Sequence, residues 1–422
     1  MASAEVSLSA DDGDVSVWKD RTDDSSDLKR TFSRAQPDSP LPSEVVARAH
    51  MLCAQYLGGA WKAATREQFT IHQMTGGMSN LLFLVSLSPS LPPTVAAEPR
   101  RALLRIHCQT DIDQLLSESV VFTLLSERCL GPKLLGVFPG GRFEQFIPSR
   151  PLACDEISDE KMIRKIAPML ARVHSLHVPI GKDPQLLIRA RGWLSKWSET
   201  ASGKAGVDIS CCKASVPSDK FPAHVSSADL LAELDFVQRF LDASNSPIVF
   251  SHNDLQEGNI LLVDKEDDEV VSDNTENEDM ALIDFEYCDY NYRGFDLGNH
   301  FCEHGLDYSF PEHPFYTIHQ DRWEDSGHRR LFAQSYRDEL VELSKESPVA
   351  ADLMSLDGSS EVSVIEEEAR LFQAISHIFW ACWALLNKEE CSIPFGYSEY
   401  ARDRLALYFE RKPLLEQFLR DH

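Results

Sequence analysis

Two acidic residues and one asparagine form the pattern that most constrains this chain. The run Ser251-His-Asn-Asp-Leu-Gln-Glu-Gly-Asn-Ile-Leu-Leu262 is followed about twenty residues later by Leu282-Ile-Asp-Phe-Glu286. Carboxylate and amide oxygens are typical ligands of Mg²⁺, and a further carboxylate can accept the proton of an attacking hydroxyl. Asp254, Asn259 and Asp284 are therefore the residue types that such chemistry requires. The alternative is that these are ordinary turn acids, since acids before short strands are common.

This order of residues resembles the catalytic loop and the metal-binding aspartate of protein-kinase-like phosphotransferases. The resemblance implies an α+β fold of two lobes, a small β-rich N-terminal lobe and a large, mostly helical C-terminal lobe. The chain departs from the protein-kinase pattern, because His252-Asn-Asp254 replaces His-Arg-Asp and Asp284-Phe-Glu286 replaces Asp-Phe-Gly. No Ala-Pro-Glu stretch follows. We therefore expect a small alcohol, and not a protein side chain, to accept the phosphoryl group.

The N-terminal part divides into a tail and a β-rich segment. Residues 1–42 are rich in Asp, Ser and Pro and have few large apolar residues in any period, so we expect a disordered acidic tail. A helix is predicted from Ser43. Alternating apolar runs then predict strands at 69–74, 80–87, 102–107, 133–138 and 142–147. We assign residues 43–147 to an N-terminal nucleotide-binding lobe.

The candidates for nucleotide binding lie in this lobe. They are Gly76, Gly77, Met78, Ser79 and Asn80 in a turn between strands, Arg105, Glu118, and Gln145, Phe146 and Ile147 at the lobe junction. Glycines let a backbone approach phosphates closely, although most such turns bind nothing. Arg105 occupies the place of the protein-kinase lysine, and Glu118 on the following helix is placed to pair with it. Backbone groups at the junction are expected to meet adenine.

The C-terminal part, residues 148–422, is predicted to be a catalytic and substrate-binding lobe. Two short apolar runs, 259–263 and 280–284, predict strands that join the two motifs. The insert at 264–279 holds nine acids against one Lys and is expected to be a solvated loop. Helices are predicted at 159–177, 227–242, 331–345, 365–387 and 397–409.

Two longer motifs resemble the signatures of choline/ethanolamine kinases. They are His252-Asn-Asp-Leu-Gln-Glu-Gly-Asn259 and Asp284-Phe-Glu-Tyr-Cys-Asp-Tyr-Asn-Tyr-Arg-Gly-Phe-Asp-Leu-Gly-Asn-His-Phe-Cys-Glu303. The resemblance also includes 76–80, 118–119, 131–134 and 144–150, and it runs from about residue 43 to the C-terminus. It implies ATP with Mg²⁺, conversion of choline to phosphocholine as the first step of phosphatidylcholine synthesis by the CDP-choline route, and commonly a homodimer. Leu255-Gln-Glu-Gly258 resembles the choline branch.

The resemblance also implies the substrate site. Asp254 is implied as the base, Asn259 and Asp284 as metal ligands, and Arg105 as a cation that neutralises charge. The implied choline site consists of Asp254, Gln256, Tyr287, Glu303, Tyr308, Trp380, Trp383, Phe395 and Tyr400. A quaternary ammonium has no N–H to donate, so aromatic faces with a nearby carboxylate are what can recognise it. Trp380 and Trp383 stand three apart on one face of an apolar helix, where the alternative is a purely structural core role.

Composition excludes several classes of function. The chain has 41 Lys and Arg against 67 Asp and Glu, a net charge of −26, which would repel nucleic acid and anionic membrane surfaces. No basic segment followed by an apolar run begins the sequence, and the apolar run near 374–386 is too short to cross a bilayer, so we expect no stable membrane insertion. The ten cysteines show no zinc spacing. We expect a cytoplasmic enzyme.

Three other functions remain open from the sequence. The first is ethanolamine kinase or a mixed choline/ethanolamine kinase. The second is a non-catalytic pseudokinase scaffold, against which the presence of Asp254, Asn259 and Asp284 argues. The third is an antibiotic-type or sugar phosphotransferase, which shares the Asp-x4-Asn loop but has no need for the Trp and Tyr side chains.

Overall fold

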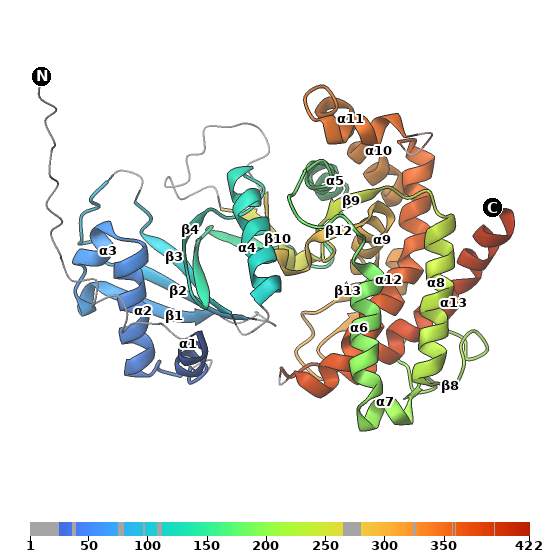
Figure 1. The fold of residues 1–422 in the computed structure, drawn as a ribbon, viewed down its shortest axis with the longest axis horizontal. Helices are drawn as coiled ribbons and strands as arrows, with labels where there is room; N and C mark the ends of the chain where they lie inside the picture. The colour runs from blue at the N-terminus through green and yellow to red at the C-terminus, as the bar shows by residue number, and fades with distance from the viewer. Residues whose placement is uncertain are drawn as a thin grey trace, which may run out of the picture. The chain divides into compact units, whose positions relative to one another are not determined.

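The computed structural model describes residues 25–35, 39–74, 80–95, 98–107, 112–264, 280–323, 326–356, 358, 360–391 and 393–422. The chain forms two compact units (Figure 1). The first consists of residues 1–112 and 133–146, and the second of residues 113–132 and 147–422. The helix α4 (Ile112–Glu127) therefore lies almost entirely in the second unit, although sequence position alone places it among the N-terminal strands.

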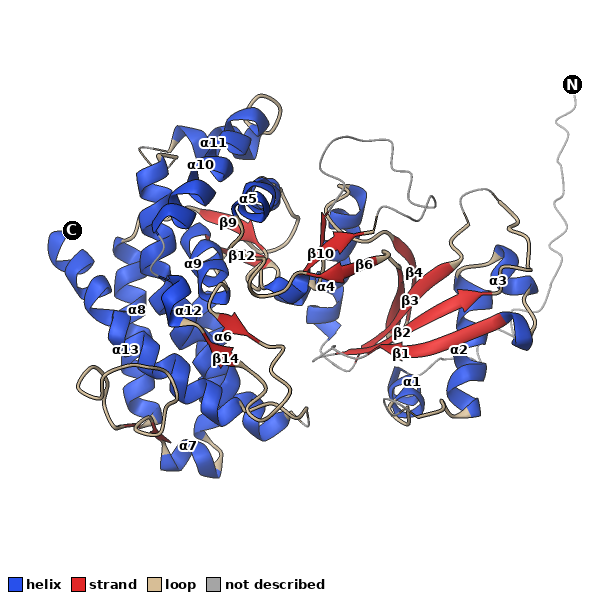
Figure 2. Cartoon of the chain, turned by 180° about the vertical axis from the view of Figure 1, so that it is seen from behind, coloured by secondary structure: helices blue, strands red, loops and turns tan. Residues whose placement is uncertain are grey.

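The first unit is built on one antiparallel sheet, shown in red in Figure 2, with the strand order β1-β2-β3-β5-β4. Its elements are α1 (Ser25–Phe32), α2 (Ser43–Tyr56), α3 (Gly59–Ala63), β1 (Phe69–Met74), β2 (Asn80–Leu87), β3 (Arg101–His107), β4 (Leu134–Phe138) and β5 (Gly141–Gln145). Alternate residues of β3, Ala102, Leu104 and Ile106, are fully buried, because successive side chains of a strand point to opposite faces. The helices α1 and α2 contribute to the same hydrophobic core.

Helix α1 shows that the prediction of a disordered tail over residues 1–42 is wrong for its last part. Leu28 and Phe32 are fully buried, and the ring of Phe32 meets that of Phe83 edge-on at 5.1 Å. Burying two such side chains contributes about 1.5–3 kcal/mol each toward the cost of ordering one short helix. Residues 1–24 and 36–38 of the predicted tail lie outside the described residues.

The second unit is mostly helical, with short strand pairs. Besides α4, its helices are α5 (Glu160–His174), α6 (Leu186–Ser198), α7 (Ala201–Ala205), α8 (Ser227–Ala243), α9 (Arg293–Glu303), α10 (Ser326–Leu343), α11 (Pro348–Ser355), α12 (Val362–Glu390) and α13 (Tyr397–Asp421). Its strands are β6 (Ser149–Pro151), β7 (Val207–Asp208), β8 (His224–Val225), β9 (Ile248–Ser251), β10 (Ile260–Val263), β11 (Met280–Leu282), β12 (Asp289–Tyr292), β13 (Leu306–Asp307) and β14 (Thr317–Ile318). The predicted acidic insert lies, after Asp264, outside the described residues.

Helix α12 is the core of this unit and packs against α9 and α13 (Figures 1 and 2). A Cβ built at Gly298 of α9 would lie 2.6 Å from the backbone carbon of Phe372, so only glycine permits this close approach of α9 to α12. The apolar run near 374–386 alone is too short to cross a bilayer, but the whole of α12 is long and apolar enough by length and composition. In the folded protein 89% of the most apolar window of α12 is buried. This burial disfavours a membrane-spanning role and explains its apolar sequence as core packing.

Candidate functional site

The first motif forms a loop between β9 and β10, in which Asp254 and Asn259 are in direct contact. Asn259 Nδ2 donates to the backbone carbonyl of Asp254 at 2.8 Å and to its carboxylate Oδ2 at 3.0 Å. The carbonyl of Asn259 accepts a hydrogen bond of 3.0 Å from the amide of Ile283, which precedes Asp284. The structure thus brings the predicted base beside one predicted metal ligand, and joins both to the strand end that carries the other.

The site concentrates negative charge. The pKa of the Asp254 carboxyl is raised well above its ordinary value, first by burial and then by the charges of Glu303, Asp284 and Glu286, while the bond from Asn259 opposes the shift. Four acidic side chains therefore act on one another in a region partly closed to water. A field of this kind favours the binding of cations.

The donor set fits a hard cation such as Mg²⁺. Because Asn259 Nδ2 is bonded to Asp254, its amide oxygen is the atom left to serve as a ligand, together with the carboxylate of Asp284. Among the described residues no three His, Cys, Asp or Glu side chains are grouped to hold a metal by themselves. Mg²⁺ does not require such a group, since it usually takes one or two protein ligands and completes its shell with water and substrate phosphates.

Asp296 of α9, which sequence reasoning missed, holds in place the loop that carries Asp254. Its fully buried carboxylate accepts hydrogen bonds from the backbone amides of His252 (2.7 Å) and Asn253 (2.8 Å), and from His174 Nε2 (3.0 Å). Although burial raises its pKa, these bonds and the two neighbouring histidines hold it below the ordinary value. Asn253 adopts a left-handed φ of 66°, which these bonds help to hold.

The imidazole of His252 supports the same loop. Its Nδ1 accepts from the amide of Asp254 at 3.3 Å, so Nε2 carries the proton and donates to the carbonyl of Ile283 at 3.1 Å. Burial lowers the pKa of His252, which keeps the ring neutral and consistent with this arrangement. His252 therefore links the strand end before Asp284 to the loop that carries Asp254.

The six aromatic side chains predicted for the substrate site form one cluster. They are Tyr287, Tyr308, Trp380, Trp383, Phe395 and Tyr400, and we call them the aromatic cage. The ring of Trp380 lies edge-on to Tyr287 at 5.3 Å and to Trp383 at 5.5 Å. Trp383 Nε1 donates to the hydroxyl of Tyr287 at 3.0 Å. The helix α12 thus presents both tryptophans to the turn that follows Asp284.

Another member of the cage, Tyr308, contacts Glu303, the last residue of α9. The ring of Tyr400 lies 5.5 Å from Phe395 and 6.3 Å from Tyr308. The Tyr308 hydroxyl donates to Glu303 Oε2 at 2.9 Å, and Arg404 Nη2 donates to Glu303 Oε1 at 2.8 Å. Arg404 was not predicted from the sequence. Nothing in its local pattern on α13 distinguishes it from the other arginines of that helix.

Gln256 has a local structural contact. Its side-chain Oε1 accepts the amide of Gly258 at 3.1 Å and caps the turn Glu257–Asn259. A contact of Gln256 with substrate stays a prediction.

The nucleotide-binding candidates lie partly within the described residues. Gly76, Gly77, Met78 and Ser79 lie outside them, and Asn80 begins β2. Phe146 lies beneath the guanidinium of Arg101 at 4.8 Å, the amide of Gln145 donates to the Lys133 carbonyl at 2.8 Å, and the Ile147 carbonyl accepts from Ser149 at 2.8 Å. The adenine contacts of these residues stay predictions.

Arg105 is oriented by a residue that sequence reasoning missed. Its Nε donates to Glu144 Oε1 at 2.7 Å, and Arg142 Nε donates to the same oxygen at 2.7 Å. Although burial raises the pKa of Glu144, the two guanidinium groups lower it to about 2. Glu118, the predicted partner of Arg105, lies on α4 in the second unit, and their pairing stays a prediction. The alternation of β5 opposite β3 is the signal that could have identified Glu144.

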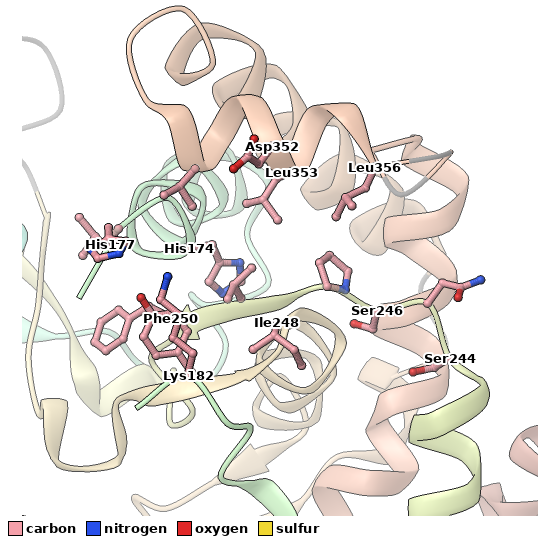
Figure 3. Close-up of a pocket in the computed structure, with 16 residues that line it drawn as sticks. His174, His177, Lys182, Ser244, Ser246, Ile248, Phe250, Asp352, Leu353 and Leu356 are labelled. Carbon is pink, nitrogen blue, oxygen red and sulfur yellow. The ribbon is translucent and has the colours of Figure 1, made fainter. Parts of the chain in front are cut away.

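A separate cavity of about 750 Å³ lies in the second unit, between the end of α5, β9 and α11 (Figure 3). Leu353 and Leu356 point toward the strand that carries Ile248 and Phe250. None of the residues that line this cavity is a predicted site residue. The cavity touches the catalytic loop indirectly, because His174 in its wall is bonded to Asp296.

Comparison with known proteins gives one consistent answer. Residues 71–409 match the family described as Choline/ethanolamine kinase. The chain is 41% identical over 391 residues to choline kinase A2 of Caenorhabditis elegans, covering 88% of this chain and 87% of that protein. It is 38% identical to the choline/ethanolamine kinase of Rattus norvegicus, covering 90% of each. A solved choline kinase from Cryptosporidium parvum has the same fold, with a TM-score of 0.67 at 24% identity, covering 88% of this chain and 96% of that one.

Proposed function

The chain belongs to the choline/ethanolamine kinase family, and from that premise we propose that it transfers the γ-phosphoryl group of ATP to the hydroxyl of choline. The products are phosphocholine and ADP. One observation carries the proposal: the aromatic cage and Glu303 lie in the same unit as Asp254, and the charges of Glu303 and Asp254 act on each other. A phosphotransferase that acts on an uncharged sugar has no use for a cluster of six such rings, one of which, Tyr308, is bonded to a buried carboxylate.

In the proposed mechanism Asp254 acts on the hydroxyl of choline. The carboxylate accepts a hydrogen bond from that hydroxyl and takes its proton as the oxygen bonds to the γ-phosphorus and the bond to the β-phosphate oxygen breaks. Asn259, bonded to both the carbonyl and the carboxylate of Asp254, fixes the direction of the base. Burial and the surrounding acids favour its protonation, which suits a group that must hold a proton at the end of the step.

Mg²⁺ would be held by Asn259 and Asp284, and it would neutralise charge on the phosphates of ATP. Arg105 would add positive charge toward the phosphates, with its guanidinium oriented by Glu144. Most of the acceleration then comes from positioning and from charge neutralisation, as in other phosphoryl transfers.

The cage would hold the trimethylammonium group. Each aromatic face attracts a cation by about 0.5–2 kcal/mol, and the methyl groups make apolar contact with the same faces. The carboxylate of Glu303, paired with Arg404 at 2.8 Å, would lie near the ammonium. The alternative substrate is ethanolamine, which appears beside choline in the names of several relatives.

A coupled assay of ADP release tests the proposal. Mg²⁺-ATP would be supplied with choline, with ethanolamine or with no alcohol, and Asp254→Asn would measure background. We expect choline to give the highest kcat/KM. Equal ADP release with and without any alcohol would refute an alcohol kinase, and a higher kcat/KM with ethanolamine would refute the assignment of choline.

We also propose a cytoplasmic protein that forms homodimers and binds neither nucleic acid nor membrane stably. The net charge of −26 and the burial of α12 support the last two points. Sedimentation equilibrium would measure the mass of the assembly against 47.6 kDa for one chain. A mass of one chain at all concentrations would refute the dimer.

A further inference from the structure

Four side chains around the carboxylate of Glu303 form a closed set of hydrogen bonds. Arg404 Nη2 donates to Glu303 Oε1 at 2.8 Å and to the Tyr400 hydroxyl at 2.5 Å. The hydroxyls of Tyr400 and Tyr308 are 3.0 Å apart, and Tyr308 donates to Glu303 Oε2 at 2.9 Å. We call Glu303, Tyr308, Tyr400 and Arg404 the carboxylate ring.

The direction of each proton in the carboxylate ring follows from these contacts. A carboxylate only accepts hydrogen bonds and a guanidinium only donates them. The single hydroxyl proton of Tyr308 is therefore donated to Glu303. Tyr400 must therefore donate to Tyr308, and its own oxygen accepts from Arg404. The pKa values of both hydroxyls are raised, mainly by burial, so both keep their protons. Both oxygens of Glu303 thus already accept a hydrogen bond.

The ring also reduces the charge that Glu303 presents. Arg404 and Glu303 are almost fully buried, at 1% and 2% exposure. Although burial lowers the pKa of Arg404, Tyr400 and Glu303 raise it above the ordinary value, so the guanidinium stays charged. The carboxylate and the guanidinium therefore form a nearly neutral pair toward a third ion. The attraction for a substrate cation then rests mostly on the aromatic faces.

From this geometry we infer that Arg404 and the Tyr308 hydroxyl are positioning residues that make the site select quaternary over primary ammonium alcohols. The inference rests on the proposed function and deepens it. A primary ammonium loses hydrogen bonds to water on entry and needs acceptors in return, whereas a trimethylammonium has no N–H and needs none. By using one lone pair of each Glu303 oxygen and pairing its charge with Arg404, the carboxylate ring makes Glu303 a weaker acceptor for the N–H groups of a primary ammonium, and a trimethylammonium needs no acceptor.

The test compares a series of alcohols that differ only in the number of ammonium N–H groups: ethanolamine, its N-methyl and N,N-dimethyl derivatives, and choline. The measured quantity is the kcat/KM of each relative to choline, in wild type, Tyr308→Phe and Arg404→Met. Tyr308→Phe keeps the aromatic side chain and removes the hydroxyl that donates to Glu303 and accepts from Tyr400. We expect relative kcat/KM for ethanolamine to rise at least threefold in Tyr308→Phe and about tenfold in Arg404→Met. This rise in relative kcat/KM over wild type should become smaller with each methyl group that replaces an N–H in the substrate.

Three comparisons separate this role from a structural one. Tyr408 lies on α13 with Arg404, and its buried hydroxyl donates to Glu233 of α8 at 2.6 Å. Tyr408→Phe removes this similar bond and should leave the relative kcat/KM values within twofold of wild type. Arg404→Lys keeps the positive charge, so its kcat/KM for ethanolamine relative to choline should lie closer to wild type than that of Arg404→Met. If Arg404→Met does not fold, Tyr308→Phe decides alone.

Two results would overturn the inference. One is a relative kcat/KM for ethanolamine within twofold of wild type in every folded variant. The other is a gain that rises with methyl number, which would indicate a wider cage and not a released carboxylate. Failure of the proposed function itself would look different, because wild type would then phosphorylate no member of the series.

Discussion

Replacing Trp383 by Ala tests the aromatic cage most directly. The side chain is half-buried, lies 5.5 Å from Trp380 and 5.6 Å from Tyr397, and donates to the Tyr287 hydroxyl at 3.0 Å. The substitution removes one aromatic face, a loss of about 0.5–2 kcal/mol of attraction for the ammonium. Since about 1.4 kcal/mol corresponds to tenfold, KM for choline should rise roughly 2- to 30-fold.

The same substitution also removes packing, and the two effects can be measured apart. Replacing a buried Trp by Ala costs about 3–5 kcal/mol of folding free energy, which is an upper limit for a half-buried side chain. Trp383→Phe keeps an aromatic face but loses the bond to Tyr287, so its KM should lie between those of wild type and Trp383→Ala. Trp193→Ala is the matched control, because Trp193 packs on Phe379 of the same helix at 4.9 Å without belonging to the cage.

The assay is steady-state kinetics with choline and with ATP, beside thermal unfolding of each variant. Trp193→Ala should lower the melting temperature and leave KM for choline unchanged, whereas Trp383→Ala should change both. A choline KM within twofold of wild type in folded Trp383→Ala would assign this side chain to the core. It would refute the proposal that Trp383 contacts the ammonium group of choline. An equal rise in KM for ATP would also contradict it.

Three further outcomes follow from other features. Asp254→Asn should lower kcat by about 10²–10⁴ while ATP affinity, measured by calorimetry, changes little, and a kcat above a tenth of wild type would remove Asp254 as the base. Deleting residues 1–24 should leave the melting temperature unchanged, whereas Phe32→Ala should destabilise the first unit by up to about 3–5 kcal/mol, and an unchanged urea midpoint would show that α1 does not pack there. The pKa of Glu144 is about 2 against an ordinary 4.5, so its stabilisation is complete above about pH 4.5 and is lost as pH falls toward 2. Acid unfolding of wild type and of Glu144→Gln would be followed by circular dichroism, and the variant should not show the loss of stability that wild type shows between about pH 4.5 and 2. Superimposable unfolding curves of the two proteins would contradict stabilisation of the ionised Glu144 by the two guanidinium groups.

Local spacing predicted the parts of the site that are close in sequence. Asp254 and Asn259 are five residues apart, so one tight turn suffices to bring them into contact. Trp380 and Trp383 share a helix face because they are three residues apart. In both cases the geometry of a single element decides the result, and that geometry is readable from residue spacing.

Long-range contacts account for most of what was missed. Arg404 binds Glu303, which is 101 residues away in the sequence, and Asp296 binds the backbone of His252, which is 44 residues away. No periodicity of the sequence relates such positions. Helix α6 was not predicted, because Gly192 and several charged residues interrupt its apolar pattern. Helix α1 was missed for a different reason: two buried side chains within an acidic, polar stretch do not change its average composition.

The contacts of Asp296 have a consequence for how the catalytic loop moves. The amides of His252 and Asn253 donate to a carboxylate that is itself fully buried and held by α9, so water cannot reach them while α9 is docked on α12. In hydrogen–deuterium exchange these two amides should therefore belong to the slowest class of the second unit, with protection close to that of helix α12. Slow exchange of these two amides in the presence and in the absence of substrate would show that this part of the backbone keeps its bonds to Asp296 when substrate binds.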